Sequence, residues 1–132
     1  MKIEVLEKND TNLRIIVKDA DIPLMNAIRR LALAEVPCMA IEEVVMIENS
    51  SILQDEIIAH RLGLTPLKTD LAAYNLPDEC PCQSEFGCQQ CRVTLTLDAE
   101  AKDATRTVYS GEIVSENPEI IPVSDTIPIV KL

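Results

Sequence analysis

Four of the five cysteines of this chain lie within residues 80–91, and their spacing is the strongest chemical signal in the sequence. Cys80, Cys82, Cys88 and Cys91 form the pattern C-x-C-x5-C-x2-C. The surrounding residues 74–90 show neither helical nor strand periodicity and contain few apolar side chains, so something other than a hydrophobic core must hold them. Four thiolates on one short loop are the tetrahedral ligand set that structural zinc prefers. The sequence therefore predicts a metal-closed loop over residues 77–92.

Three interpretations of this cluster are open from the spacing alone. Structural zinc is favoured because the C-x2-C half has the spacing usual for zinc knuckles, although C-x-C is less common. An iron–sulfur cluster also uses four thiolates and would make the protein an electron-transfer module. Reduced or disulfide-bonded cysteines are the third interpretation, and a cytosolic location disfavours the disulfides. Visible absorbance would separate a reducible iron centre from zinc.

The other candidates for chemistry have ordinary structural explanations. We interpret Cys38, which follows a proline on an apolar segment, as a small buried hydrophobic residue. His60 is the only histidine, so no histidine-pair metal site can form. We place it at the end of a helix, where it assists the last carbonyls. Adjacent carboxylates at 42–43 and 55–56 point in different directions on a helix or strand. No nucleophile–base pair is recognisable, and three glycines exclude a glycine-rich phosphate loop.

Composition bounds the class of protein. The 132 residues, 47% of them hydrophobic, suffice for one domain, or for one domain and a piece of another. Because only 2% are aromatic, the core must consist of aliphatic side chains and Met. The net charge of −10 argues against direct nucleic-acid binding, which requires a surplus of Lys and Arg on one face. No apolar run has the length of a signal peptide or a membrane span, so we interpret the protein as cytoplasmic.

The first part of the chain predicts a β-hairpin followed by a helix. Apolar residues alternate over residues 2–8 and 13–18, and the polar residues 9–12 between them favour a turn. Asp21 can cap the helix that follows, and Pro23 suits its first turn. The helix ends at Val36-Pro37. Leu24, Ile28 and Leu31 form one apolar stripe, which we expect the neighbouring strands to cover. Met25, Ala32 and Leu33 add a second apolar flank, so the helix requires two neighbours.

The remainder predicts a mixture of short elements. Residues 39–48 alternate, with Ile41, Val45 and Ile47 on one face, and favour a strand covered on both sides. Asn49-Ser50-Ser51 can cap a second helix, which Gly63 would end in a left-handed conformation. Residues 92–98 and 107–114 favour further strands. Prolines from residue 117 onward allow edge strands but hardly a central one.

The run NAIRRLALAEVP, followed by AIEEV, ENSS, DEIIAHRLGL and PLK, resembles a known family. It is similar to the archaeal DNA-directed RNA polymerase subunits that are the counterparts of the third-largest eukaryotic polymerase subunit and of bacterial alpha. The match covers nearly all of residues 21–68 without a gap, and DEIIAHRLGL is its more specific half. The resemblance implies a non-catalytic assembly subunit of a nucleotidyltransferase complex that acts in transcription.

The resemblance also implies an α+β fold with two domains. Residues 1–48 would be the N-terminal part of a split, alpha-subunit-like dimerisation domain, built from the hairpin and the helix. Residues 49–132 would be an inserted, mostly-β domain that carries the Cys loop. Members of the family are longer and return to the dimerisation domain with a second long helix, whereas this sequence ends at residues 127–132, which resemble the end of the insertion. We therefore expect an N-terminal fragment.

Partners follow from the same resemblance. A small alpha-like subunit would pair with the helix face that carries Met25, Ala32 and Leu33, and the pair would support the two large polymerase subunits. Arg29 and Arg30 alone would be interpreted as ordinary snorkelling side chains. The arginine pair and Asn26 match the family's motif, however, where this region faces the second-largest subunit. Eukaryotic members have a similar zinc loop, which strengthens the zinc interpretation. The resemblance implies no direct contact with nucleic acid or membrane.

Overall fold

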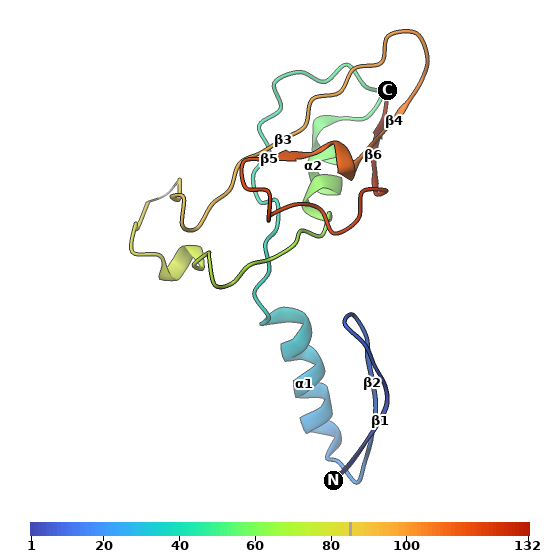
Figure 1. Ribbon diagram of the computed structural model, residues 1–132, viewed down its shortest axis with the longest axis vertical. Helices are drawn as coiled ribbons and strands as arrows, with labels where there is room; N and C mark the ends of the chain where they lie inside the picture. Colours follow the sequence, from blue (N-terminus) through green and yellow to red (C-terminus); the bar gives the residue numbers. More distant parts are fainter. Residues whose placement is uncertain (85) are drawn as a thin grey trace. The chain divides into compact units, whose positions relative to one another are not determined.

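The chain forms two compact units in a computed structural model that describes residues 1–84 and 86–132 (Figure 1). The first unit is Met1–Val36 and the second is Pro37–Leu132. Helices and strands occur together, in agreement with the predicted α+β class. The division falls before residues 37–48, which the sequence had assigned to the first domain. These residues belong to the second unit because Ile41, Val44 and Met46 pack against its core.

The first unit begins with the predicted hairpin. Strand β1 (Lys2–Lys8) pairs antiparallel with β2 (Leu13–Lys18), and Ile3 lies opposite Val17 in the register. A bulge interrupts the ladder between Val5 and Glu7. The side-chain Oδ1 of Asn9 closes the turn, because it accepts the backbone N–H of residues 11 and 12 at 3.1 and 2.6 Å. A local side-chain acceptor of this kind is the reason that Asn favours turns.

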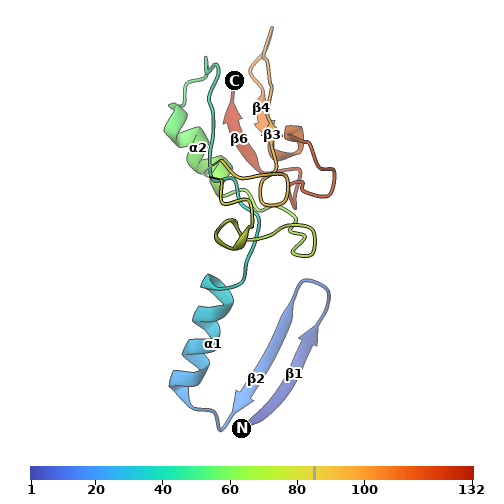
Figure 2. The ribbon, with the colours of Figure 1, turned by 90° about the vertical axis from the view of Figure 1, so that its left-hand side faces the viewer.

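Helix α1 (Ile22–Ala34) follows and runs alongside the hairpin in both views (Figures 1 and 2). Pro23 lies in its first turn, as predicted. The predicted side-chain cap is wrong, because the Asp21 carboxylate makes no capping hydrogen bond. Instead, the Asp21 backbone carbonyl accepts the N–H of Met25 at 3.1 Å. The C-terminal end is closed by the N–H of Glu35, which donates to the Leu31 carbonyl at 2.9 Å.

No side chain of the first unit, all of which the structure describes, is buried. We expected neighbouring strands to cover the apolar stripe of α1, but Leu24, Ile28 and Leu31 are each about half exposed. Leu33, on the second flank, is 76% exposed. The strand expected at residues 39–48 does not form, and Ile41, Val44 and Met46 of that segment pack on the core of the second unit. The apolar surface of hairpin and helix thus remains open to solvent.

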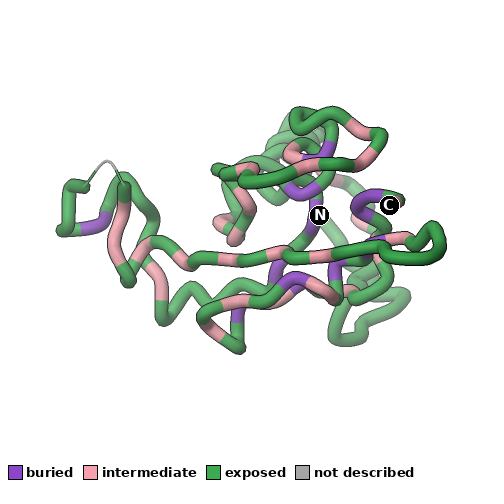
Figure 3. The backbone as a smooth tube through the Cα atoms, turned by 90° about the horizontal axis from the view of Figure 1, so that it is seen from above, coloured by how far each residue is buried: buried purple, intermediate pink, exposed green. Residues whose placement is uncertain are grey.

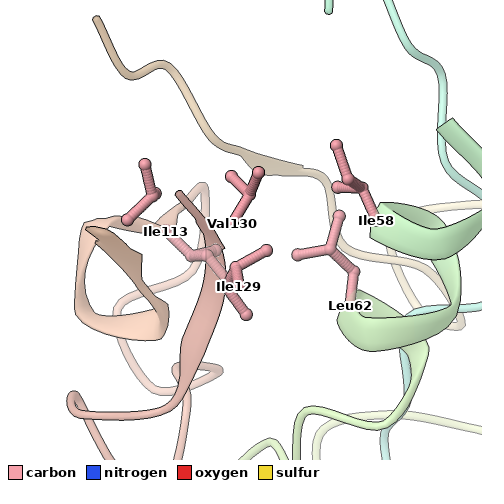
Figure 4. Close-up of a cluster of buried hydrophobic side chains, with 6 residues drawn as sticks. Ile58, Leu62, Ile113, Ile129 and Val130 are labelled. Atoms are coloured by element: carbon pink, nitrogen blue, oxygen red, sulfur yellow. The ribbon is translucent and has the colours of Figure 1, made fainter. Parts of the chain in front are cut away.

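All buried residues in the described part of the chain belong to the second unit, and Figure 3 marks buried residues in purple. Its elements are α2 (Asp55–Gly63), the short 3-10 turns η1 (Pro77–Glu79) and η2 (Ser110–Glu112), β3 (Leu95–Thr96), β4 (Thr107–Tyr109), β5 (Val114–Ser115) and β6 (Pro128–Lys131). Two antiparallel pairs, β3 with β5 and β4 with β6, form its sheets. The core is aliphatic, as composition predicted, and Figure 4 shows α2 side chains directed toward β6. It consists of Ile58, Leu62, Val108, Ile113, Ile129 and Val130.

Three local predictions in this unit are wrong. Residues 39–48 form no strand, and Val45 and Ile47, placed on a covered face, are 84% and 96% exposed. Helix α2 begins only at Asp55, because Asn49 and Ser51 bond each other in a separate turn. Gly63 is not left-handed. Thr65 contributes to this helix end instead, since its Oγ1 donates to the Arg61 carbonyl at 3.1 Å.

We expect Ile129→Ala to destabilise the second unit by about 2–5 kcal/mol. Ile129 is fully buried on β6 and packs in the core, so truncation leaves a cavity that the small unit cannot fill. Chemical denaturation followed by circular dichroism measures the change. Ile52→Ala is the matched control, because Ile52 is 95% exposed and its truncation should leave stability unchanged. Equal effects of the two substitutions would contradict this core.

Candidate metal centre

The Cys loop is closed at its base and carries two local turns. The N–H of Asn75 donates to the Gln90 carbonyl at 2.8 Å, which joins the two ends of the loop. Turn η1 leads directly into Cys80, whose N–H donates to the Pro77 carbonyl at 3.3 Å. The N–H of Cys91 donates to the Cys88 carbonyl at 3.0 Å and forms the turn of the C-x2-C half. Short-range backbone bonds thus hold Cys80, Cys88 and Cys91 on local turns.

Gly87 permits the tight approach of the last cysteine. It has a φ of 71°, in the left-handed region that side chains other than Gly rarely adopt. A Cβ added at this position would lie 3.3 Å from the Cys91 sulfur and 3.2 Å from the Arg92 Cβ. Both the backbone conformation and the crowding therefore favour glycine directly before Cys88.

The four sulfur atoms form a compact group whose members all lie within 4.8 Å of one another. The Sγ atoms of Cys80 and Cys88 are 3.7 Å apart, and those of Cys82 and Cys91 are 3.9 Å apart. The Cys88 and Cys91 sulfurs are also separated by 3.9 Å. A tetrahedral ion with metal–sulfur bonds of about 2.3 Å would hold its ligands about 3.8 Å apart. The spacing of the thiols therefore fits a single ion.

These thiols are not joined as disulfides, since a sulfur–sulfur bond is about 2.05 Å long and all four cysteines are free. Backbone donors point at two of the sulfurs. The N–H of Cys88 lies 3.2 Å from the Cys91 Sγ, and the N–H of Gln90 lies 3.4 Å from the Cys88 Sγ. Such donors stabilise negative charge on a thiolate. The group of four cysteines could hold a metal ion.

The environment separates the pKa values of the thiols. The Ser84 backbone N–H, helped by hydrogen bonding with Cys80, lowers the pKa of Cys82 to about 7. A backbone hydrogen bond from Cys82 acts to lower the pKa of Cys80, but burial and the neighbouring thiols outweigh it and raise that pKa to about 12. A backbone bond from Cys88 likewise acts on Cys91, yet burial and the other sulfurs raise the pKa of Cys91. Without a cation, the group resists full deprotonation.

The remaining predicted residues lie apart from this centre. Cys38 is exposed, so the prediction of a buried residue is wrong. His60 lies in the last turn of α2, as predicted. Arg29 and Arg30 are exposed on α1, together with Asn26, Ala32 and Leu33, whereas Met25 is half-buried. Arg30 lines a shallow hollow with Ala27, Leu31, Ala34 and Glu35. No helix of the described residues is long and apolar enough to cross a membrane.

The sequence analysis missed Arg92. Its guanidinium Nη2 lies 2.9 Å from the Glu43 carboxylate, and its Nη1 donates to the Phe86 carbonyl at 2.9 Å. The sequence feature that could have identified it is its position, because Arg92 directly follows the last cysteine and its guanidinium can donate several hydrogen bonds.

These observations define an α+β protein with an unburied hairpin–helix unit and a second unit that carries a four-thiol loop. The chain belongs to the family described as the RNA polymerase Rpb3/Rpb11 dimerisation domain, whose model matches residues 14–130. It is 44% identical to DNA-directed RNA polymerase subunit Rpo3 of Methanosphaera stadtmanae over 100% of this chain and 49% of that protein. It is 40% identical to Rpo3 of Archaeoglobus fulgidus over 99% of this chain and 48% of that protein.

Rpo3 of Methanothermobacter thermautotrophicus is also 44% identical, over 100% of this chain and 49% of its own length. The chain thus spans about half the length of the curated relatives it matches. The resemblance to the archaeal counterparts of the third-largest eukaryotic polymerase subunit is confirmed by these matches.

Proposed function

We propose that this chain acts as a non-catalytic assembly subunit of a DNA-directed RNA polymerase. The observation that carries the proposal is the match of residues 14–130 to the dimerisation-domain family. The relatives at 40–44% identity are named as subunits of this enzyme. Within the described residues, the candidate metal ligands are the four cysteines of the thiol loop. Four thiolates are typical of a structural metal site rather than a catalytic one. The chain's work is to present surfaces to other subunits.

The first unit is the surface for a small, alpha-like partner subunit. Its hairpin and helix expose Ile3, Val5, Leu13, Ile15, Leu24, Ile28, Leu31 and Leu33. Exposed apolar area of this extent is typical of a protein–protein interface. Burying a Leu-sized side chain contributes about 1.5–3 kcal/mol, so a partner that covers several of these exposed side chains would gain several kcal/mol of binding free energy. Met25, Ala32 and Leu33 belong to this interface in our proposal.

The second unit corresponds to the inserted domain, and its loop binds zinc through Cys80, Cys82, Cys88 and Cys91. Sulfur separations of 3.7–3.9 Å support a single ion. In a four-iron cluster each thiolate binds a different iron, and in a two-iron cluster the thiolates bind as two separated pairs. Either cluster would hold some of the sulfurs further apart than the 4.8 Å that encloses this group, so an electron-transfer role is not favoured. Zinc supplies a redox-inert crosslink. The free thiols fit a cytoplasmic location, where cysteines stay reduced.

Arg29 and Arg30 present the surface for a large polymerase subunit. We expect the double substitution Arg29→Ala, Arg30→Ala to weaken assembly of the large subunits about tenfold or more, because truncating arginine at an interface commonly costs above 1 kcal/mol. Both side chains are exposed, so the fold should not change. Reconstitution of the full-length protein with the small partner and the large subunits, followed by gel filtration, measures assembly.

Circular dichroism of the same variant provides the control for folding. Pairing with the small partner should be retained, since that interface is apolar in our proposal and alanine keeps an apolar side chain at both positions. Lys102→Ala, Lys131→Ala, at two exposed residues of the second unit, is a matched change of charge and should leave assembly intact. Loss of helical signal in the arginine variant would show that these arginines support the fold, and unchanged assembly would contradict the proposed contact.

A further inference from the structure

Arg92 joins the Cys loop to a distant segment of the second unit. Its Nη1 donates to the Phe86 carbonyl inside the loop at 2.9 Å. Its Nη2 forms an ion pair with the Glu43 carboxylate, 49 positions earlier in the sequence, at 2.9 Å. Among the ion pairs of residues 1–84 and 86–132, this is the only one that connects the loop to another part of the chain.

Both the main chain and the aliphatic part of the side chain of Arg92 are held by the loop. The Arg92 N–H donates to the Cys88 carbonyl at 2.9 Å, so the residue is part of the turn that holds two of the thiols. Its stem lies against Gly87, where an added Cβ would come within 3.2 Å of the Arg92 Cβ and 3.6 Å of its Cδ. The planar guanidinium fork can then serve two acceptors at once, which an ammonium group does less well.

Glu43 belongs to the segment of residues 37–48, which begins three residues after the end of α1. This segment has no strand partner, and it is held by Ile41, Val44 and Met46 on the core. The N–H of Met39 adds one bond, to the Thr69 Oγ1 at 2.9 Å. A segment with so few backbone bonds depends on side-chain contacts for its position, and the Glu43–Arg92 pair is one of them.

We propose that Arg92 is a positioning residue that couples metal binding at the four cysteines to the placement of residues 37–48 through Glu43. The inference rests on the metal site proposed above. An ordered loop presents the guanidinium to Glu43, and by linkage the held guanidinium favours the metal-bound loop in return. The Arg92 and Glu43 side chains are 47% and 64% exposed, so the coupling is modest and weakens as salt screens it.

The first test measures zinc affinity by competition with a chromophoric chelator. Arg92→Ala should weaken zinc binding about three- to tenfold, the range expected for losing a charged hydrogen bond and a partly exposed ion pair. Arg92→Lys should fall between wild type and alanine, because lysine can meet Glu43 but cannot serve both acceptors. Arg106→Ala is the matched control: Arg106 forms a similar pair with Glu112 at 2.8 Å outside the loop, and its loss should leave zinc affinity unchanged.

The second test measures hydrogen exchange of residues 41–48 with and without zinc. In the wild-type protein, zinc should raise protection both in the loop and in this segment. In Arg92→Ala and in Glu43→Gln, zinc should protect the loop alone. The coupling is overturned if the wild-type protein binds zinc and the Arg92→Ala variant has the same zinc affinity and the same zinc-dependent protection at residues 41–48. A wild-type protein that takes up no zinc overturns the metal site itself, and the coupling with it.

Discussion

Replacing Cys88 with serine will abolish metal binding and unfold the loop of residues 77–92, while the core around Val108 and Ile129 stays folded. Cys80 is the only described residue of this loop that is buried, so packing contributes little to its order. The Cys88 sulfur lies 3.7 and 3.9 Å from two other thiols, and its removal leaves three ligands around one ion. Serine is a poor replacement because zinc prefers thiolate sulfur over a neutral hydroxyl.

Elemental analysis should show about one zinc ion per wild-type chain and close to none in the variant. Cys38→Ser is the matched control, because Cys38 is a free exposed thiol outside the loop and its loss should leave the zinc content unchanged. Acid should mimic Cys88→Ser, since metal binding requires thiolates and protons compete for them below the thiol pKa values. Wild-type protein without zinc or iron would overturn the site.

Leu33→Glu will convert a self-associating chain into one that sediments as a monomer at micromolar concentration. Leu33 is 76% exposed on the second flank of α1, together with the exposed Ala32, so two copies can bury this flank against each other. Losing one buried Leu costs about 1.5–3 kcal/mol, and the buried carboxylate adds a desolvation cost. Because 1.4 kcal/mol is a factor of ten, association should weaken by about 30-fold or more.

The proposed small partner subunit provides the second arm of this experiment. Adding the small alpha-like subunit to the full-length protein should replace self-association with a defined heterodimer, and Leu33→Glu should weaken that heterodimer as well. Ile52→Glu places the same charge on a 95% exposed isoleucine of the second unit and should leave both equilibria unchanged. A wild-type chain that sediments as a monomer, with pairing insensitive to Leu33→Glu, would show that another surface mediates dimerisation.

Local chemistry in the sequence was enough to predict the hairpin, α1 and the thiol loop. Asn9 accepts the backbone N–H groups that its turn leaves free, and Pro23 lies where a helix needs no donor, so each signal acts within a few residues. The four cysteines likewise lie on one loop, where short turns bring them together. The zinc identity and the interface residues stay predictions.

Long-range packing decided the elements that the sequence analysis misplaced. In residues 39–48, Val44 and Met46 contact the core, as two residues on one face of a strand would. Ile41 also packs against the core, although in a strand it would lie on the opposite face. Alternation cannot say whether a strand partner exists, and none pairs with these residues in the described structure. Gly63 was expected to be left-handed, yet its φ is not positive, and its neighbour is the Ile41 carbonyl, 3.4 Å from where a Cβ would be. Neither the core beside residues 39–48 nor the Ile41 carbonyl beside Gly63 can be predicted from the neighbouring sequence.

The closed base of the thiol loop leaves the number of residues between Cys82 and Cys88 nearly unconstrained, whereas a hydrogen-bonded turn fixes the spacing of Cys88 and Cys91. Once Asn75 and Gln90 have joined the loop ends, lengthening the five-residue spacer between Cys82 and Cys88 changes only a short closure. Loop-closure entropy grows with the logarithm of length, so two added residues cost about 0.3 kcal/mol. Gly87 is the exception, because its backbone conformation is required beside Cys88. Related loops can therefore drift in spacer length over evolutionary time while their ligands stay in place.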